Sequence, residues 1–405
     1  MNILIINHYA GSIKRGFEYR PYYFGKEFLK RGHNVFIICS SYSHLRKDNP
    51  RMNKKISRET FEGLHYYWIR TPRYSGNGIK RALNIISFVF GVYSHIHLFI
   101  KEVNPDVIVA SSTYPLDIFP ASKMAKLNKA KLIFEVHDLW PLTPIELGGM
   151  NRNHPFIKLL QIGEDYAYKN SDKIISILPK AKEYMVQHGM NPEKFHFIPN
   201  GIDLSEWEKN NDLPVEHINI ISDLKNKKMF LVGYAGSIGL ANALEFLIDS
   251  ADILKNKPVS FLIVGRGPEK NKLMEKAKNL KNIYFLPPVV KTSVANFLNL
   301  MDVLYIGFLD KPIYRFGVGT NKIYEYMMAG KPIIQSQKAG NDLIEENKCG
   351  ISVKPEDPAQ IAKAVMTLYN MNEEDRKSLG KNGREYVTRN HNFSALAEKF
   401  LNAIS

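Results

Sequence analysis

Short runs of apolar residues recur along the first half of the chain, and longer amphipathic stretches separate them. The runs cover residues 2–7, 34–39, 106–111, 131–136, 173–178 and 194–199. Strands that are buried on both faces of a parallel sheet read as continuous apolar runs, and crossover helices supply the amphipathic stretches between them. The pattern therefore predicts an α/β domain with parallel strands.

The same pattern starts again in the second half of the chain. Its apolar runs cover residues 229–236, 260–267, 282–288, 302–308, 331–336 and 350–355. A chain of 405 residues fits two domains of ordinary size, and the polar stretch before Met229 interrupts the periodicity. We predict an N-terminal domain over 1–205, a second domain over 206–385, and a terminal helix over 386–405 that could return to the first domain.

Charge and cysteine content narrow the classes of function. Lysine and arginine outnumber aspartate and glutamate by 55 to 40, a net charge of +15, which favours an anionic partner such as nucleic acid, a phosphorylated ligand or acidic lipid. Cys39 and Cys349 have no metal-type spacing, so we expect them to pack in a reducing compartment. The first residues have no basic segment or cleavage site of a signal peptide.

The longest apolar segment runs from Leu83 to Ile100 and follows several arginines and lysines. It contains Asn, Ser and two His, which argues against a membrane span. Two alternatives stay open, a buried core helix and a helix that touches a membrane surface.

In open parallel sheets, ligands bind at the loops that follow the strands. The loop after the first run carries Gly11, whose backbone could approach a phosphate or simply form a turn. His137 and Asp138 follow a buried strand, where an imidazole can donate to hydroxyls or exchange protons. Alternatively, Asp138 caps a turn and His137 packs. No HExxH motif or nucleophile elbow is present, so zinc and serine hydrolase functions lose support.

Several loops in the second half combine glycine with basic residues. Gly236 and Ser237 end one predicted strand, and Arg266 and Lys270 follow the next. Backbone amides at such glycines can face an anion that the basic side chains neutralise, although glycine also permits close helix–strand packing. Neither loop has the whole GxGxxG pattern of a dinucleotide site.

The segment from Arg315 to Ile334 combines glycines with a single carboxylate in an apolar helix. Gly317 and Gly319 expose backbone amides just before a predicted helix start at Thr320 or Asn321, which makes an anion site. Glu325 could then accept hydrogen bonds from a ribose diol while Lys322 holds a diphosphate. The alternative is that Glu325 is a favourable charge on an exposed first turn.

These segments resemble, in order and spacing, the GT-B glycosyltransferases of family four. The resemblance rests on "KRGHNV", "EVHDLWP", "IPNGID", "GYAGSIG", "FLIVGRGPEK" and "NKIYEYMMAGKPII". It implies two Rossmann-like parallel-sheet domains facing a central cleft, and a retaining enzyme that needs no metal and no cofactor, with a UDP-sugar as donor substrate. The chain is most similar to transferases of O-antigen and capsule synthesis, including N-acetyl-L-fucosamine transferases.

The resemblance also implies partners and a location. The acceptor would be a saccharide, commonly on undecaprenyl diphosphate, at the inner face of the cytoplasmic membrane, so we expect a cytoplasmic, peripheral protein. The basic excess and the Leu83 to Ile100 segment fit such docking. No nucleic-acid partner is expected, because no RNA- or DNA-binding motif appears.

Residue by residue, Glu325 matches the second glutamate of the family's E-x7-E motif, and Gly317 stands where the first would be. Ser237 and Asn242 replace the Arg and Lys pair that usually clamps the diphosphate, which leaves Arg266, Lys322 or Arg315 to supply charge. His137 matches the family's active-site histidine. The expected catalytic residues are His137, Arg266 and Lys322, and the expected binding residues are Gly11, Gly236, Ser237, Lys270, Arg315, Gly317, Gly319, Thr320, Asn321 and Glu325.

Two alternatives remain. A UDP-sugar epimerase of the same architecture would need several carboxylates around the sugar to move protons, and the loops have few. A non-catalytic sugar-nucleotide or nucleic-acid binder would fit the loss at Gly317 and the positive charge. Turnover separates the first from transfer, and salt-dependent oligonucleotide binding would reveal a nucleic-acid partner.

Overall fold

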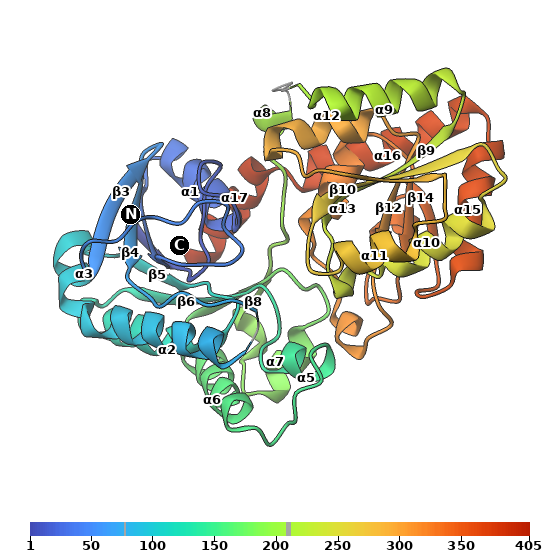
Figure 1. Ribbon diagram of the computed structural model, residues 1–405. Coiled ribbons are helices and arrows are strands. Elements are labelled where there is room, and N and C mark those ends of the chain that lie inside the picture. The colour runs from blue at the N-terminus through green and yellow to red at the C-terminus, as the bar shows by residue number, and fades with distance from the viewer. Residues whose placement is uncertain (77, 208–211) are drawn as a thin grey trace. The chain divides into compact units, whose positions relative to one another are not determined.

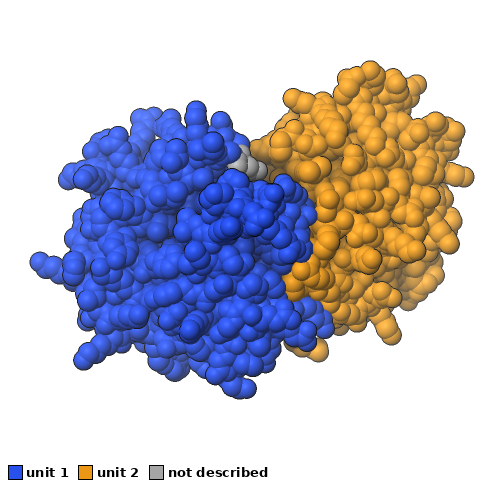
Figure 2. All heavy atoms as spheres, turned by 90° about the horizontal axis from the view of Figure 1, so that it is seen from below, with its two compact units in different colours: residues 1–199, 393–405 blue, residues 200–392 orange. Residues whose placement is uncertain are grey.

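The computed structural model describes residues 1–76, 78–207 and 212–405, and it divides into two compact units (Figures 1 and 2). The first unit comprises Met1–Pro199 and Phe393–Ser405, and the second comprises Asn200–Asn392. The divisions expected from the sequence, after residues 205 and 385, differ slightly. Residues just past Pro199 lie with the second unit because Ile202 N–H donates to the carbonyl of His391 at 2.7 Å.

The first unit is built on an eight-stranded sheet with the order β3-β4-β2-β1-β5-β6-β7-β8. All neighbouring strands are parallel except β3 and β4. The strands are β1 (Asn2–Ile6), β2 (Asn34–Ser40), β3 (Ile56–Phe61), β4 (Leu64–Ile69), β5 (Val107–Ala110), β6 (Lys131–Val136), β7 (Lys173–Ser176) and β8 (Phe195–Phe197). Each apolar run of the first half is therefore confirmed as a strand.

The sequence pattern missed the antiparallel hairpin of β3 and β4. Its turn consists of Glu62 and Gly63, both with positive φ, as a tight two-residue connection requires. Strand β3 has polar positions along an edge and so lacks the continuous apolar run that identified the other strands. Strand β4 is mostly buried and adds Trp68 to the core.

Helices cover the sheet of the first unit. They are α1 (Arg20–Lys30), α2 (Ile79–Ser94), α3 (Ile96–Val103), α4 (Ile118–Asn128), α5 (Leu142–Glu146), α6 (Pro155–Asn170), α7 (Lys182–Gln187) and α17 (Phe393–Ile404), with 3-10 turns at Pro115–Asp117 and Pro192–Lys194. The chain's last helix, α17, packs against α1. The ring of Phe393 lies 5.4 Å from that of Phe24, and Phe400 lies 5.3 Å from Phe28.

The second unit contains an all-parallel sheet with the order β11-β10-β9-β12-β13-β14. Its strands are β9 (Phe230–Ser237), β10 (Val259–Arg266), β11 (Ile283–Leu286), β12 (Val303–Gly307), β13 (Ile333–Ser336) and β14 (Gly350–Val353). Its helices are α8 (Leu204–Trp207), α9 (Val215–Asn226), α10 (Leu244–Ile253), α11 (Lys270–Lys276), α12 (Val294–Asn299), α13 (Asn321–Met328), α14 (Leu343–Glu346), α15 (Pro358–Asn370) and α16 (Glu373–Asn390), with 3-10 turns at Leu240–Asn242, Lys291–Ser293 and Pro312–Phe316. The predicted repetition of the α/β pattern is confirmed.

Both sheets reverse their strand order beside the first strand of the unit. In the first unit β1 lies between β2 and β5, and in the second β9 lies between β10 and β12. Loops that leave such a switch point in opposite directions open a crevice outside the carboxyl ends of the strands, where ligands bind. This topology directs attention to the segments after β1, β5, β9 and β12.

The apolar segment from Leu83 to Ile100 is divided between α2 and α3 at His95. Ile85, Phe88 and Val92 face the core, whereas Phe90 is 69% exposed. Within the described residues, no single helix is long and apolar enough to span a membrane, and α2 and α3 meet that test only as a pair bent by 59°.

Candidate active site

Lys322 lies at the start of α13 and reaches the end of β9. Its ammonium donates to the phenol oxygen of Tyr234 at 2.7 Å and to the side-chain oxygen of Asn242. Burial lowers the pKa of Lys322 to about 7, against a smaller opposing effect of Glu325. A lysine that is only partly charged near neutral pH gains a proton, and with it binding energy, when an anion arrives.

Glycine at position 236 makes room for this lysine. A Cβ built on Gly236 would meet the Cδ of Lys322 at 3.0 Å, and the φ of +153° disfavours any other residue. The neighbouring strand approaches even more closely, since a Cβ on Gly265 would lie 1.9 Å from the Gly236 carbonyl oxygen. The expected glycines of these two loops thus pack the strand ends tightly and also admit a cationic side chain.

Glu325 lies one turn further along α13 and forms an ion pair with Lys291. Both side chains are partly exposed, at 15% for Glu325 and 27% for Lys291. The sequence left open that Glu325 is simply an exposed surface charge. Its carboxylate is mostly buried and forms an ion pair, so that alternative is wrong. A carboxylate has about four acceptor positions, so Glu325 retains capacity for hydroxyl donors beside Lys291.

The glycine loop before α13 is fixed by asparagine side chains. Val318 N–H donates to the side-chain oxygen of Asn341 at 2.8 Å, and the side-chain amide of Asn200 donates to the carbonyl of Gly319 at 2.7 Å. Gly317 has a φ of +100°, which glycine tolerates and other residues rarely adopt. Thr320 and Asn321 begin the helix, as expected.

The other expected residues of the second unit lie in three kinds of environment. Ser237 and Arg266 are paired in register at the ends of β9 and β10, and both are exposed. Lys270 donates to the carbonyls of Gly265 and Leu286, at 3.2 Å each, so its charge is directed at strand ends. Arg315 lies in a 3-10 turn with its guanidinium 4.2 Å from the Phe316 ring and 2.6 Å from the Pro312 carbonyl.

His137 is held between two carboxylates in the first unit. Its Nδ1 lies 2.8 Å from Glu18, which belongs to the loop after β1. Its Nε2 lies 3.1 Å from Glu135, at the end of β6, and 3.0 Å from the Ser111 hydroxyl, just after β5. The histidine therefore connects the segments that follow β1, β5 and β6, at the switch point of this sheet.

Electrostatics keep this histidine charged. Burial opposes the charge, but Glu18 and Glu135 outweigh it and raise the pKa of His137 to about 10. Burial likewise opposes the charge of Glu135, but Arg20 and His137 hold its pKa well below the usual range. An imidazolium is a hydrogen-bond donor at both nitrogens and has no lone pair to accept a proton.

Gly11 and Asp138 belong to the same surroundings. Gly11 N–H donates to the backbone carbonyl of Glu18 at 2.8 Å, which shapes the loop that carries that glutamate. Asp138 accepts from Leu139 N–H at 3.0 Å and from the Thr143 hydroxyl at 2.6 Å. The turn-capping role considered for Asp138 is thus observed, and His137 is more than a packing residue.

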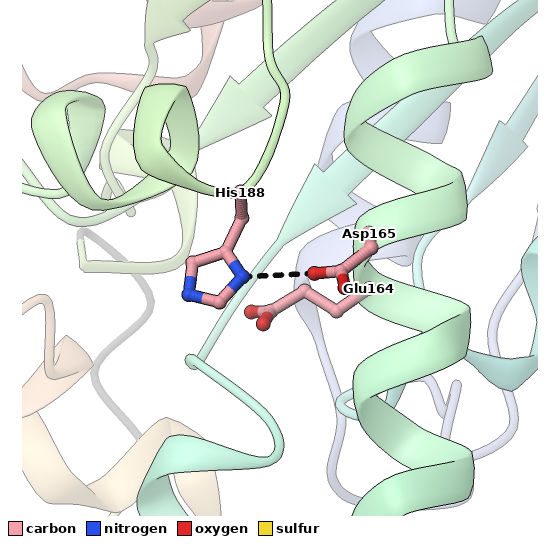
Figure 3. A group of neighbouring side chains, drawn as sticks. All are labelled: Glu164, Asp165 and His188. Carbon is pink, nitrogen blue, oxygen red and sulfur yellow. Dashed lines mark hydrogen bonds and ion pairs between the residues drawn. The ribbon is translucent and has the colours of Figure 1, made fainter.

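A separate polar cluster in the first unit joins α6 to the residue that follows α7 (Figure 3). His188 Nδ1 lies 2.8 Å from Asp165, and the adjacent Glu164 accepts from the hydroxyls of Tyr168 at 2.9 Å and Tyr184 at 2.8 Å. Burial, against the effect of these hydrogen bonds, raises the pKa of Glu164 to about 8. Because its oxygens already have donors, we assign Glu164 to the support of the fold.

Sequence reasoning missed several residues that complete these sites. They are Glu18, Arg20, Ser111, Glu135, Tyr234 and Lys291. Glu135 carried a usable signal, since a carboxylate inside an otherwise apolar strand needs a partner. The others are ordinary polar residues in loops or strands, and only the folded chain shows what they contact.

Comparisons with known proteins agree with this arrangement. Residues 15–206 match the domain described as Glycosyltransferase Family 4, and residues 230–371 match the one described as Glycosyl transferases group 1. The putative colanic acid biosynthesis glycosyl transferase WcaI of Escherichia coli K12 is 26% identical over 267 residues, which span 64% of this chain and 64% of that relative.

Solved structures share the fold at low identity. Sucrose-phosphate synthase from Thermosynechococcus elongatus has a TM-score of 0.73 at 16% identity, over 99% of this chain and 97% of the other. Anabaena HepE in complex with UDP has a TM-score of 0.69 at 13% identity, over 99% of both chains. The chain is thus similar to a family 4 glycosyltransferase domain over one range and to a group 1 glycosyltransferase domain over the other, and its fold is GT-B.

Proposed function

We propose that the protein is a retaining, metal-independent glycosyltransferase that moves a sugar from a UDP-sugar to a saccharide carried by a lipid diphosphate in polysaccharide synthesis. One observation carries the donor half of this proposal. Lys322 and Glu325 lie one helical turn apart, beside the carboxyl end of β9, at the switch point of the second sheet. The fold is shared with a protein solved in complex with UDP.

In this arrangement, different residues bind the diphosphate and the ribose of UDP. Lys322 neutralises the diphosphate, and the backbone amides of the glycine loop add donors at the start of α13. Glu325 accepts hydrogen bonds from the ribose hydroxyls. The contact between Lys322 and Asn242 matters here, because Asn242 stands where the family usually has a basic residue, so a lysine from α13 supplies charge at that place.

The chemistry follows from leaving-group stabilisation. The bond between the sugar's anomeric carbon and the diphosphate oxygen breaks, and the acceptor oxygen forms its bond to that carbon on the same face. The acceptor's proton passes to the departing phosphate oxygen. His137, held as an imidazolium, acts as a hydrogen-bond donor and not as the base. Catalysis is then mostly positioning and electrostatic stabilisation of the diphosphate.

In the same proposal, the acceptor saccharide is carried on undecaprenyl diphosphate at the inner face of the cytoplasmic membrane, and the sugar is an N-acetylated or deoxy hexosamine. The basic excess of the chain supports an anionic acceptor. The similarity to a protein named for colanic acid biosynthesis supports a role in polysaccharide assembly.

The test compares melting temperatures with UDP, GDP, ADP and CMP. A ligand at about 100 times its dissociation constant stabilises a folded protein by about 2.7 kcal/mol, so a shift with UDP alone is expected. In Glu325→Ala, loss of hydrogen bonds to a charged group should weaken UDP binding by ~1.5–3 kcal/mol. The paired control is Glu345→Ala, an exposed carboxylate in α14. A shift with GDP alone would contradict the UDP donor, and no shift with any nucleotide would contradict transfer itself.

A further inference from the structure

The first unit has a hollow of about 660 Å³ between the segments that follow β2 and β4. It is lined by residues 41–42, 49–53 and 70–73. Since both segments follow the carboxyl ends of their strands, the hollow opens at the sheet edge that also carries His137. None of the residues expected from the sequence to bind or react lines it.

Hydrogen bonds fix the walls of this hollow. Thr71 contacts Ser40 through its hydroxyl at 2.6 Å and donates its N–H to the hydroxyl of Ser41 at 3.1 Å. Ser41 N–H in turn donates to the Ile69 carbonyl at 2.8 Å. On the opposite wall, the side-chain amide of Asn49 donates to the Ser43 carbonyl at 3.0 Å. The hollow therefore exists before any ligand binds.

Three arginines, Arg51, Arg70 and Arg73, give the hollow its charge. All three are exposed, no carboxylate lines the hollow, and the described residues offer none of the three an ion pair. Guanidinium groups match phosphate oxygens with paired hydrogen bonds. Three of them around one hollow favour a ligand with more than one negative charge.

Helix α2 brings an apolar surface to the same place. The side-chain amide of Asn84 donates to the carbonyl of Pro72, in the wall of the hollow, at 2.6 Å. The exposed face of α2 carries an apolar stripe that consists of Ile79, Leu83, Ile86, Phe90 and Tyr93, at spacings of four and three residues. The helix contains no acidic residue, so nothing on it repels an anionic head group.

The cationic hollow and the apolar stripe of α2 together restrict the class of ligand that can bind. A cationic hollow alone would fit any phosphate, and an apolar stripe alone would fit many surfaces. We propose that the hollow and the stripe together bind a lipid diphosphate, with the diphosphate among Arg51, Arg70 and Arg73 and the hydrocarbon along α2. A diphosphate diester carries two negative charges, against one for an ordinary phosphodiester lipid, and so suits three guanidinium groups better.

This site rests on the proposed function, because it names the part of the first unit that holds the acceptor's lipid carrier. It makes a separate prediction, however, since the ligand contacts only residues of the first unit. Binding is therefore measured without any sugar nucleotide, by calorimetry with geranyl diphosphate, inorganic diphosphate and geraniol as probes. UDP stabilisation is measured independently on every variant.

We expect geranyl diphosphate to bind at least about tenfold more tightly than inorganic diphosphate, since burying hydrocarbon adds to the charge contacts. The triple variant R51Q/R70Q/R73Q should lose at least about tenfold in affinity for both diphosphates. Its control, K257Q/K281Q/K363Q, removes the same charge from exposed positions of the second unit and should bind as wild type does. Both should keep the UDP-induced melting shift.

The apolar half has its own pair of variants. I79Q/L83Q, at positions 81% and 56% exposed, should weaken geranyl diphosphate but leave inorganic diphosphate unchanged. Its control, V215Q/L240Q, changes exposed apolar residues of the second unit and should change neither. Equal affinity of wild type for the two diphosphates would refute the lipid contact.

Two further results would overturn the proposal. One is unchanged geranyl diphosphate binding in the arginine variant. The other result concerns vesicles of phosphatidylglycerol. If the wild-type protein binds them, geranyl diphosphate does not displace it, and the arginine variant no longer binds them, the three arginines bind the anionic membrane surface and not a lipid diphosphate. If UDP did not raise the melting temperature of the wild-type protein while geranyl diphosphate still bound to it, the proposed donor would be refuted, and the lipid diphosphate site would be unaffected.

Discussion

The ammonium of Lys322 lies 2.7 Å from the phenol oxygen of Tyr234 and 4.6 Å from the centre of the same ring. The two residues come from the start of α13 and the interior of β9, so the contact fixes the helix start against the end of the strand. The ammonium of Lys322 is thereby held beside the glycine loop that precedes α13, where it can neutralise a bound anion.

Lys322 predicts a pH dependence of UDP binding. Its pKa of about 7 leaves it partly neutral at physiological pH, and a bound diphosphate favours the charged form. Binding then takes up a proton, so affinity should fall as pH rises above 7, by at most about tenfold per pH unit. Calorimetric titration with UDP between pH 6.5 and 9 measures this.

The matched variant is Lys322→Met, which keeps the length of the side chain without its charge. It should bind UDP more weakly at pH 7, and its affinity should be nearly flat from pH 7 to 9. A pH dependence in Lys322→Met equal to that of wild type would show that another group takes up the proton.

Gly236→Ala should weaken UDP binding through Lys322. The added Cβ would crowd the Cδ of Lys322 at 3.0 Å, and the backbone φ of +153° adds strain. Strain of this kind costs about 1–3 kcal/mol of stability. The control is Gly239→Ala, whose Cβ would approach nothing closer than 3.7 Å. Chemical denaturation and UDP titration of both variants check the prediction, and equal effects of the two substitutions would contradict it.

His137 should remain protonated across the neutral range. Its pKa is raised to about 10, so the stability that it contributes is fully present below pH 6.5 and is lost as pH rises toward 10. In NMR spectra its ring resonances should not titrate between pH 6 and 8. Glu18→Gln removes one of the two carboxylates and should bring the titration to lower pH, whereas Glu62→Gln, an exposed loop substitution, should not.

Ring resonances of His137 that titrate near pH 6.5 in wild type would contradict the assignment of a permanent charge. They would also restore the histidine as a candidate proton acceptor in transfer.

Glu164 predicts the opposite trend from an ordinary surface carboxylate. Its pKa is raised from 4.5 to about 8, so the folded protein holds a proton that the unfolded chain releases. Stability should therefore fall as pH rises from 4.5 to 8, by about 1.4 kcal/mol per pH unit from this group alone. Glu164→Gln keeps the shape and removes the titration.

Urea unfolding of both proteins at pH 6 and pH 8 checks this. The advantage of Glu164→Gln over wild type should grow between the two values, and Glu183→Gln, an exposed substitution in α7, should show no such change. An equal loss of stability in wild type and Glu164→Gln would contradict it.

The strand pattern of both units follows directly from the sequence. Continuous apolar runs identify strands that are buried on both faces, and this local property depends little on the rest of the chain. The hairpin from Ile56 to Ile69 is the exception, because its edge strand β3 keeps polar positions and so lacks the apolar run, and β4 pairs with it. The loop glycines, His137 and Glu325 could also be identified from the sequence as candidate site residues, since each interrupts the apolar pattern around it.

The contacts of these residues depend on how the chain folds in three dimensions. Lys322 and Asn242 are 80 residues apart, and Glu18 reaches His137 from the loop after β1, whereas Glu135 reaches it from β6. Such contacts depend on the order of strands in the sheet, which local periodicity does not encode. Burial then lowers the pKa of Lys322, whereas Glu18 and Glu135 raise that of His137 against the effect of burial. The apolar pattern of the sequence thus predicted the two α/β units and several candidate residues, and the packing of the folded chain set the contacts and the charge of those residues.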